Sequence, residues 1–353
     1  MIAGPAPVPG GQGGGSVNAL SLLLALVLSV WSHVAMAAGV VGTVTIEMDN
    51  QAVSRKITSE LWFEAAAGAS VEQFSVRPPG RAIAIARNAA PEPSSGKRPL
   101  IVISHGNFGS RFSHGWLAVH LVNGGYVVLS TSHPGTMAGD QSATGRYRLW
   151  DRSRDVSFAI DEVLKHPRWS ALIDETRIGF VGHSFGGWTG VSLAGGRYDP
   201  VQQRAFCERA QKRDFYCAGT LKDDIAGVPA TDAGESFRDT RIKAFYIMAS
   251  GPGQGFIPES LRSISVPFMV DTGQFDEVLE PQANSSALAR QIPGAREVRR
   301  PVGHFVYVPE CVGPIPESAT LICRDPTGVD RSVVHQQVAS DVIEFFTRHL
   351  SRK

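Results

Sequence analysis

The sequence has no surplus of charge of either sign. Its 353 residues include 34 Lys and Arg against 33 Asp and Glu, a net charge of +1. Proteins that bind nucleic acid usually carry a basic surplus or basic stripes, so this balance predicts no nucleic-acid partner. The hydrophobic fraction of 43% and the charged fraction of 19% are typical of a globular chain and not of a disordered one.

Charge is also missing from the start of the chain, where no charged side chain precedes Glu47. An apolar run at 19–31 falls short of the about 20 residues of a membrane-spanning helix. Ala35-Met36-Ala37 follows, a small-x-small pattern typical of signal-peptide cleavage. We therefore expect residues 1–37 to be a signal peptide, the protein to be periplasmic or secreted, and no membrane span to remain after cleavage. An uncleaved anchor is the alternative, because the segment has no Lys or Arg.

Cysteine is scarce, and no two cysteines have CxxC spacing. The four residues are Cys207, Cys217, Cys311 and Cys323. The spacing and the absence of clustered histidines argue against zinc, and we expect no metal. Four cysteines allow three pairings, of which the local one closes two short loops. We expect this local pairing because an exported chain meets an oxidising compartment. Four free buried thiols are the alternative.

The rest of the chain alternates between strand and helix patterns. Residues 100–103 form a continuous apolar run, typical of a strand buried on both faces. Eight strands are expected, at 40–48, 56–65, 100–103, 126–130, 178–181, 242–248, 266–270 and 295–299. Helices are expected at 115–123, 151–166, 188–194, 282–292 and 333–350. The alternation predicts the α/β class, with a mostly parallel eight-stranded sheet and helices on both faces.

No linker and no internal repeat divides the chain after residue 37. Segment 196–240 interrupts the alternation, because it is polar and holds the first cysteine pair. We expect a single domain over 38–353, with an insertion at about 196–240 that lies over the top of the sheet.

A glycine-rich turn joins the expected strand at 178–181 to the helix that follows. It reads Gly182-His183-Ser184-Phe185-Gly186-Gly187, a G-x-S-x-G motif between a strand and a helix. In this motif the serine lies on a strained turn that exposes its Oγ, and the glycines let strand and helix approach closely. Ser184 is therefore the candidate nucleophile. The alternative is a glycine-rich turn with an idle serine.

A serine hydroxyl is a poor nucleophile without a base. In this motif an acid and then a histidine follow the serine along the chain. Only His304 and His335 lie downstream. His304 follows the last expected strand, whereas His335 lies near the start of the terminal helix, where a solvated histidine is ordinary. We therefore expect His304 to be the base.

The acid must lie on a loop at the carboxyl edge of the sheet. Asp276 fits this position best, since it lies in the loop beyond the strand at 266–270. Asp271, at the end of that strand, and Glu280 are the reserve candidates. The competing role for Asp271 is to hold the loop by local hydrogen bonds to backbone N–H groups.

A pair of backbone donors completes the expected site. One is the N–H of Phe185, directly after the serine, and the other is the N–H of Asn107, in the glycine-containing loop after the strand at 100–103. Such a pair stabilises the oxyanion of a tetrahedral intermediate. His105 and His183 flank the site, and we expect each to pack and to hydrogen-bond locally.

With these parts in place, the chain resembles the α/β-hydrolases over about residues 40–350. More narrowly, it resembles the bacterial predicted dienelactone hydrolases, which share features with the platelet-activating-factor acetylhydrolase group. The segments that carry the resemblance are Leu61-Trp62-Phe63, Ile103-Ser104-His105-Gly106, Ser132-His133-Pro134-Gly135, Gly182-His183-Ser184-Phe185-Gly186-Gly187, Gly273-Gln274-Phe275-Asp276 and Gly303-His304-Phe305.

The resemblance implies carboxylic-ester hydrolysis through an acyl-enzyme, with Ser184 as nucleophile, Asp276 as acid and His304 as base. The chain departs from the family in two places. Dienelactone hydrolases have a cysteine in the turn where this chain has Ser184, which argues against dienelactone as the substrate. The tyrosine and proline that follow the family's tryptophan are replaced by Phe63-Glu64.

The expected function is that of a serine esterase, with a small-molecule or lipid-like ester as substrate and no cofactor. A lipase or phospholipase and a polyester hydrolase are the nearest alternatives. An open cleft lined by exposed aromatic side chains, with Phe108 and Trp188 as candidates, would favour a polymer. A further alternative is a catalytically inactive binding protein on the same scaffold, because a fold does not fix a function.

Overall fold

The computed structural model describes residues 39–75, 80–93, 96–210, 215–220 and 230–352. The expected signal peptide at 1–37 lies outside these residues, as does part of the expected insertion at 196–240. The cleavage of the leader and the domain boundaries therefore stay predictions.

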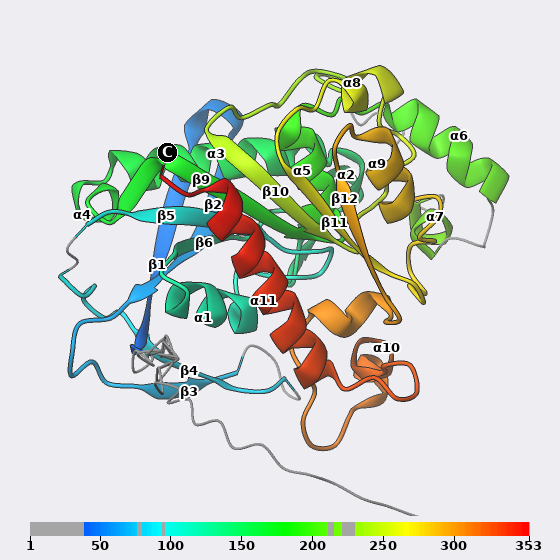
Figure 1. Cartoon of the computed structure of the whole chain (residues 1–353). Coiled ribbons are helices and arrows are strands. Elements are labelled where there is room, and N and C mark those ends of the chain that lie inside the picture. Colours follow the sequence, from blue (N-terminus) through cyan, green and yellow to red (C-terminus); the bar gives the residue numbers. More distant parts are fainter. Residues whose placement is uncertain (1–38, 76–79, 94–95, 211–214, 221–229, 353) are drawn as a thin grey trace, which may run out of the picture. The chain divides into compact units, whose positions relative to one another are not determined.

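A ten-stranded sheet forms the centre of the fold, with the strand order β12-β11-β10-β9-β5-β6-β2-β1-β4-β3 (Figure 1). The strands are β1 (Val41–Asn50), β2 (Arg55–Glu64), β3 (Glu72–Phe74), β4 (Ile83–Arg87), β5 (Arg98–Ser104), β6 (Val127–Thr131), β9 (Ile173–His183), β10 (Ile242–Met248), β11 (Phe268–Gly273) and β12 (Arg296–Arg300). Neighbouring strands run parallel from β12 to β6, whereas β2 is antiparallel to β6 and to β1. The parallel part brings the carboxyl ends of β5, β9, β11 and β12 to one end of the sheet.

The α/β class and the mostly parallel sheet are confirmed, but the predicted number of eight strands is wrong. All eight expected strands form, and β3 and β4 extend the sheet beyond β1. These two strands are short, and only Ile85 and Ala86 in them are buried. They form because β4 pairs with β1 at Gly42 and Thr43, a long-range contact that their own sequence does not encode.

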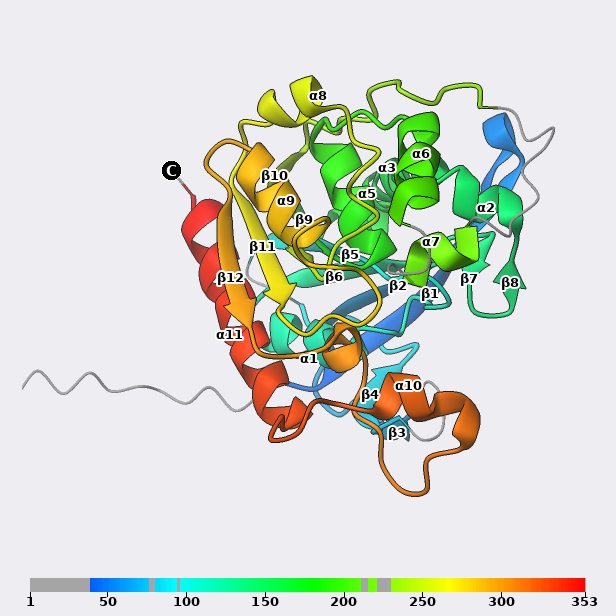
Figure 2. The same ribbon diagram turned by 90° about the vertical axis from the view of Figure 1, so that its right-hand side faces the viewer.

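Helices cover both faces of the sheet (Figures 1 and 2). Buried side chains of α3 (Trp150–Lys165), α5 (Phe185–Ala194) and α9 (Ser285–Gln291) belong to one apolar core. Those of α1 (Gly115–Asn123) and α11 (Arg331–His349) belong to the other. The remaining elements are α2 (Ala143–Tyr147), α4 (Pro167–Ser170), α6 (Pro200–Ala210), α7 (Phe215–Thr220), α8 (Pro258–Arg262), α10 (Thr320–Cys323), η1 (Gln51–Val53), η3 (His304–Tyr307), η4 (Glu317–Ala319), β7 (Thr136–Met137) and β8 (Asp140–Gln141).

The described part of segment 196–240 contains α6 and α7, which the Cys207–Cys217 disulfide joins. The segment packs on the loop after β10, where the N–H of Gly255 donates to Gln203 Oε1 at 2.9 Å. In α7 the Tyr216 ring meets the Phe185 ring edge-on, with 5.7 Å between the centroids. The disulfide therefore fixes a helix against the first turn of α5.

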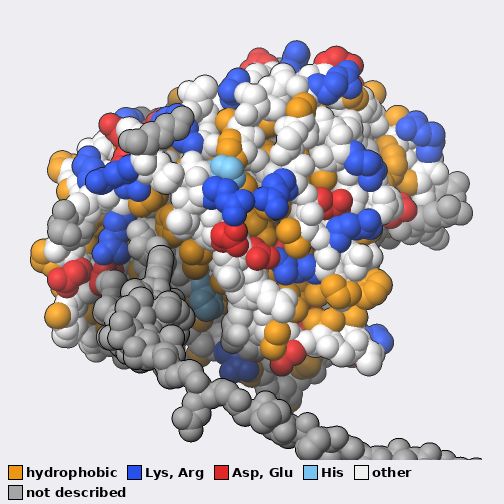
Figure 3. All heavy atoms as spheres, in the orientation of Figure 1, with side chains coloured by type: hydrophobic (Ala, Val, Ile, Leu, Met, Phe, Trp, Pro, Cys, Tyr) orange, Lys and Arg blue, Asp and Glu red, His pale blue; other side chains and the backbone are white. Residues whose placement is uncertain are grey.

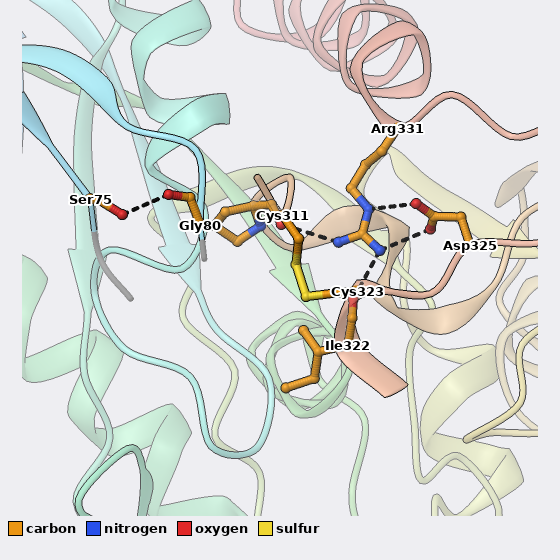
Figure 4. The surroundings of a disulfide bond; sticks show 8 residues. Ser75, Gly80, Cys311, Ile322, Cys323, Asp325 and Arg331 are labelled. Atoms are coloured by element: carbon orange, nitrogen blue, oxygen red, sulfur yellow. Dashed lines mark hydrogen bonds and ion pairs between the residues drawn. A yellow bond between two sulfur atoms is a disulfide. The ribbon is translucent and has the colours of Figure 1, made fainter. Parts of the chain in front are cut away.

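A second disulfide, Cys311–Cys323, joins the loop after η3 to α10 (Figure 4). Arg331, the first residue of α11, donates to the carbonyl oxygens of Pro309 at 3.1 Å and Ile322 at 2.9 Å. The same guanidinium pairs with Asp325. Both disulfides fit the local pairing expected from the sequence.

The surface carries both signs of charge. On the face shown in Figure 3, basic and acidic side chains are interspersed among apolar and neutral atoms. This distribution agrees with the formal net charge of +1. Among the described residues, no helix is both long enough and apolar enough to cross a membrane.

Peptide mapping of the unreduced protein should give two linked pairs, Cys207 with Cys217 and Cys311 with Cys323. Replacing both cysteines of the second pair by serine should lower the free energy of unfolding by about 3 kcal/mol, because the bond closes a loop with a sequence separation of 12. Urea denaturation of variant and wild type measures this loss. Four titratable thiols in the folded wild type, without reductant, would contradict the prediction.

Candidate active site

Ser184 lies on the turn between β9 and α5, where its φ is 56°. A positive φ is uncommon for a residue with a side chain and marks a strained turn. The N–H of Ser184 donates to the carbonyl oxygen of Met248 at 3.0 Å, and its own carbonyl accepts from the N–H of Trp188 at 3.1 Å. The turn is therefore held by β10 on one side and by α5 on the other.

Two glycines make this turn possible. A Cβ at Gly182 would collide with the carbonyl oxygen of Gly186, and a Cβ at Gly186 would collide with the carbonyl oxygen of Ser104. Both clashes lie far inside van der Waals contact and are with backbone, which cannot move aside. The close approach that the sequence predicts therefore exists, and it seats α5 against the end of β5.

His304 and Asp276 meet at the same end of the sheet. His304 Nδ1 lies 2.8 Å from Asp276 Oδ2, and each side chain is only 3% exposed. The other carboxylate oxygen of Asp276 accepts the N–H groups of Val278 at 2.9 Å and Leu279 at 2.7 Å. These bonds fix the carboxylate, which in turn orients the imidazole.

Two further side chains fix the backbone of His304. Its N–H donates to Glu277 Oε2 at 3.0 Å, and His183 Nε2 donates to its carbonyl oxygen at 3.1 Å. Burial lowers the pKa of His183 well below its ordinary value, so this ring is neutral near pH 7 and carries its proton on Nε2. Because His183 directly precedes Ser184, this hydrogen bond places His304 beside the turn that bears the serine.

The loop after β5 also reaches the serine. A Cβ at Gly106 would lie 3.0 Å from the Cβ of Ser184, so the loop backbone runs directly against that side chain. Asn107 follows Gly106, and Phe185 is the first residue of α5, where backbone N–H groups have no partner within the helix. Both expected backbone donors therefore belong to segments that border Ser184.

The reserve candidates have other roles. Asp271 accepts from Arg300 Nε at 2.9 Å and from the hydroxyls of Tyr246 at 2.9 Å and Tyr307 at 2.8 Å. It is thus buried in a side-chain network, and the expected bonds to loop N–H groups are not its role. Glu280 is exposed.

His335 is not solvated, contrary to the expectation from its place at a helix start. It is 5% exposed and stacks on Trp116, with 3.8 Å between the ring centroids. Its Nε2 lies 2.8 Å from the carbonyl oxygen of Val306. Burial lowers the pKa of His335 to about 4. These contacts give His335 a structural role in attaching α11 to η3.

Of the two candidate aromatic side chains for a polymer cleft, only one is exposed. Phe108 is 56% exposed, but Trp188 is fully buried under Tyr198 and Phe256. A second exposed aromatic, Phe275, is 58% exposed and directly precedes Asp276. Sequence reasoning missed Phe275, although its place beside the acid was a usable signal.

Sequence reasoning also missed Glu277, whose contact with His304 spans 27 residues of chain. Its place next to Asp276 was the available signal. Within the described ranges, no three His, Cys, Asp or Glu side chains come together as a metal site requires.

No protein-family model matches the chain, and no curated protein matches it. Many solved structures are similar to it, and three of them are the following. A ferulic acid esterase from Streptomyces cinnamoneus is 19% identical with a TM-score of 0.61, over 90% of this chain and 94% of that one. A dienelactone hydrolase from Anabaena variabilis is 13% identical with a TM-score of 0.47, over 87% and 98% of the two chains. A cold-adapted esterase from an Arctic intertidal metagenomic library is 12% identical with a TM-score of 0.45, over 87% and 93%.

The first of these likenesses covers nearly the whole of both chains. The mostly parallel sheet and the helices that flank it agree with this likeness. The chain has the α/β-hydrolase fold.

Proposed function

We propose that the protein is a serine hydrolase that cleaves carboxylic esters through an acyl-enzyme. Ser184 is the nucleophile, His304 the general base and Asp276 the acid that orients it. The observation that carries the proposal is the 2.8 Å contact between His304 Nδ1 and Asp276 Oδ2, in a loop that His183 holds beside the strained serine. A buried, oriented imidazole next to a serine on a strained turn has the layout of a catalytic triad.

In the first half of the reaction, Ser184 Oγ attacks the carbonyl carbon of the ester while His304 Nε2 accepts the hydroxyl proton. Asp276 holds the Nδ1–H tautomer and stabilises the imidazolium that forms. The N–H groups of Asn107 and Phe185 stabilise the negative oxygen of the tetrahedral intermediate. The intermediate then expels the alcohol, which takes the proton from His304, and an acyl ester on Ser184 remains.

In the second half, a water molecule loses a proton to His304 and attacks the acyl carbon. The second tetrahedral intermediate uses the same backbone donors. Its collapse returns the proton to Ser184 Oγ and releases the carboxylic acid. Both halves use only water and the chain's own groups.

The substrate we propose is an ester with a bulky apolar group. Phe108 and Phe275 support this proposal, because each is more than half exposed and directly follows or precedes a residue of the site, Asn107 and Asp276. Exposed aromatic side chains of this size gain free energy when an apolar surface covers them. A lipid-like ester and a polyester both present such a surface.

Export is part of the proposal. The apolar run at 19–31 with the small-x-small pattern at 35–37 supports it, and so do the two disulfides, which persist in oxidising compartments. We propose the periplasm or the exterior as the place of action.

The alanine variant of Ser184 should lose ester hydrolysis. Removal of the nucleophile of a triad lowers kcat by about 10⁴-fold or more, because only oxyanion stabilisation and binding remain. The measurement is kcat/KM on a panel of p-nitrophenyl esters of increasing acyl length. Ser250→Ala is the matched control, because Ser250 is fully buried against Gly187 and its hydroxyl has no hydrogen-bond partner among the described residues.

Full activity of Ser184→Ala would contradict the nucleophile assignment. A wild type that is folded but inactive on every ester would favour the binding protein on a hydrolase scaffold. A rise in kcat/KM with acyl length supports the lipid-like substrate.

Asp276→Asn should lower activity, whereas Asp271→Asn should lower stability. The first should lower kcat by about 10⁴-fold, since an amide holds the wrong histidine tautomer, and leave the protein folded. The second should cost about 3 kcal/mol of the free energy of unfolding, because it removes the buried carboxylate that accepts from Arg300, Tyr246 and Tyr307 and leaves Arg300 only the half-exposed Asp341. Kinetics and urea denaturation of both variants measure this. The reverse pattern would make Asp271 the acid.

A further inference from the structure

We propose that Arg152 is a positioning residue that holds together the two backbone segments carrying the oxyanion donors. The inference rests on the proposed function, since it concerns the oxyanion site of the same reaction. It assigns a role to a buried cation that no step of the mechanism uses.

Arg152 projects from α3 into the space between the end of β5 and the start of α5. It is 1% exposed, and four oxygen atoms accept from its guanidinium. The acceptors are Thr189 Oγ1 at 3.1 Å, Ser104 Oγ at 3.2 Å, Thr136 Oγ1 at 2.5 Å and the carbonyl oxygen of His105. Its fork-shaped donor group thereby contacts three different parts of the chain at once.

One arm of the guanidinium reaches the first donor segment. Arg152 Nη2 donates to the carbonyl oxygen of His105, which lies two residues before Asn107. The same nitrogen donates to Ser104 Oγ at the last residue of β5. This arm fixes the backbone just before Asn107, in the loop that borders Ser184.

The other arm reaches the second donor segment through Thr189. Arg152 Nε donates to Thr189 Oγ1 at 3.1 Å, and this hydroxyl donates to the carbonyl oxygen of Phe185 at 2.9 Å. The guanidinium carbon also lies 5.9 Å from the centroid of the Phe185 ring. One cation therefore sets the spacing between the segments of Asn107 and Phe185.

The buried carboxylate of Asp155, three residues after Arg152 in α3, is already bound by other side chains. Asp155 binds Arg55 through two oxygens, at 2.7 and 2.8 Å, and lies 3.0 Å from His133 Nδ1. The four hydrogen bonds of Arg152 described above all go to neutral oxygens, and Asp155 stabilises its charge only from a distance. A buried cation with neutral acceptors is costly, and apolar residues often replace buried charges without loss of stability. The cost of burying this cation fits a positioning role.

The side chain of His133 also holds the end of β5, where the loop with Asn107 begins. Burial lowers the pKa of His133 well below its ordinary value, so the ring is neutral. With its proton on Nδ1 and donated to Asp155, its Nε2 accepts from the hydroxyl of Ser104 at 2.9 Å. Ser104 Oγ can then accept from Arg152, so every hydrogen in this chain of bonds has one acceptor. The end of β5 is thus held from two sides.

Burial also lowers the pKa of Arg152 itself, to about 9. That value lies above neutral pH, so the guanidinium keeps its charge and all its donors under assay conditions. A misplacement of about 1 Å at a reacting group costs about 10²-fold in rate. We therefore expect loss of the Arg152 bonds to lower kcat and to leave substrate binding intact.

The test compares Arg152→Met, Thr189→Val and Thr189→Ser with the wild type. Met removes both arms, Val removes only the bond to the Phe185 segment at nearly constant volume, and Ser keeps the hydroxyl. Ser153→Ala is the matched control, because it removes another buried hydrogen bond between α3 and α5, Ser153 to Ser192 at 2.9 Å, that does not touch the oxyanion loop.

The readouts are kcat and KM on a p-nitrophenyl ester, the inhibition constant of a trifluoromethyl ketone and urea denaturation. The ketone forms a tetrahedral adduct with the serine, so its binding reports the oxyanion site. We expect kcat/KM to fall about 10²-fold in Arg152→Met and about tenfold in Thr189→Val, with KM unchanged. The inhibition constant should rise by the same factors. Thr189→Ser should restore most of the loss, and Ser153→Ala should change only stability.

Retained kcat/KM in a folded Thr189→Val or Arg152→Met would overturn the positioning role. The role would also be overturned if Ser153→Ala lost kcat/KM in the same proportion to its lost stability as the Arg152 and Thr189 variants do. If Arg152→Met does not fold, the comparison of Thr189→Val with Thr189→Ser tests the positioning role. Failure of the proposed function is distinguishable, because the wild type itself would then show no Ser184-dependent hydrolysis.

Discussion

The close approach of α5 to the end of β5 is the constraint on which the rest of the site depends. Gly186 lies so near the Ser104 carbonyl that no Cβ fits, and Gly182 is packed equally tightly against Gly186. At the same turn Ser184 has a positive φ, and the loop with Gly106 lies against its side chain. Any larger residue at these positions would separate the serine from both proposed oxyanion donors.

Further contacts hold the candidate base of the site in place. His304 is fixed at its ring by Asp276, at its N–H by Glu277 and at its carbonyl by His183. Active sites need such supporting hydrogen bonds, because a small displacement of a base or of a hydrogen-bond donor lowers the reaction rate by a large factor. We propose that Arg152 holds the backbone segments of Asn107 and Phe185 in the same way.

Much of this arrangement could be predicted from the sequence, because its signals are local. The succession of a strand, a glycine-rich turn and a helix predicts the position of Ser184. The order of an acid and then a histidine along the chain predicts Asp276 and His304. The misses depend on contacts between distant segments. His335 was expected to be solvated but stacks on Trp116, and β4 joins the main sheet by pairing with β1 as well as with β3. Arg152 contacts His105 across 47 residues, a link that no local pattern reports.

The most direct test of the central claim is covalent trapping of the nucleophile. Folded wild-type protein treated with a fluorophosphonate should gain one adduct per chain, and peptide mapping should place it on Ser184. His304→Ala and urea-unfolded protein should gain almost none, since the serine is activated only by the assembled site. An adduct on another residue, or equal labelling of the unfolded chain, would contradict the account.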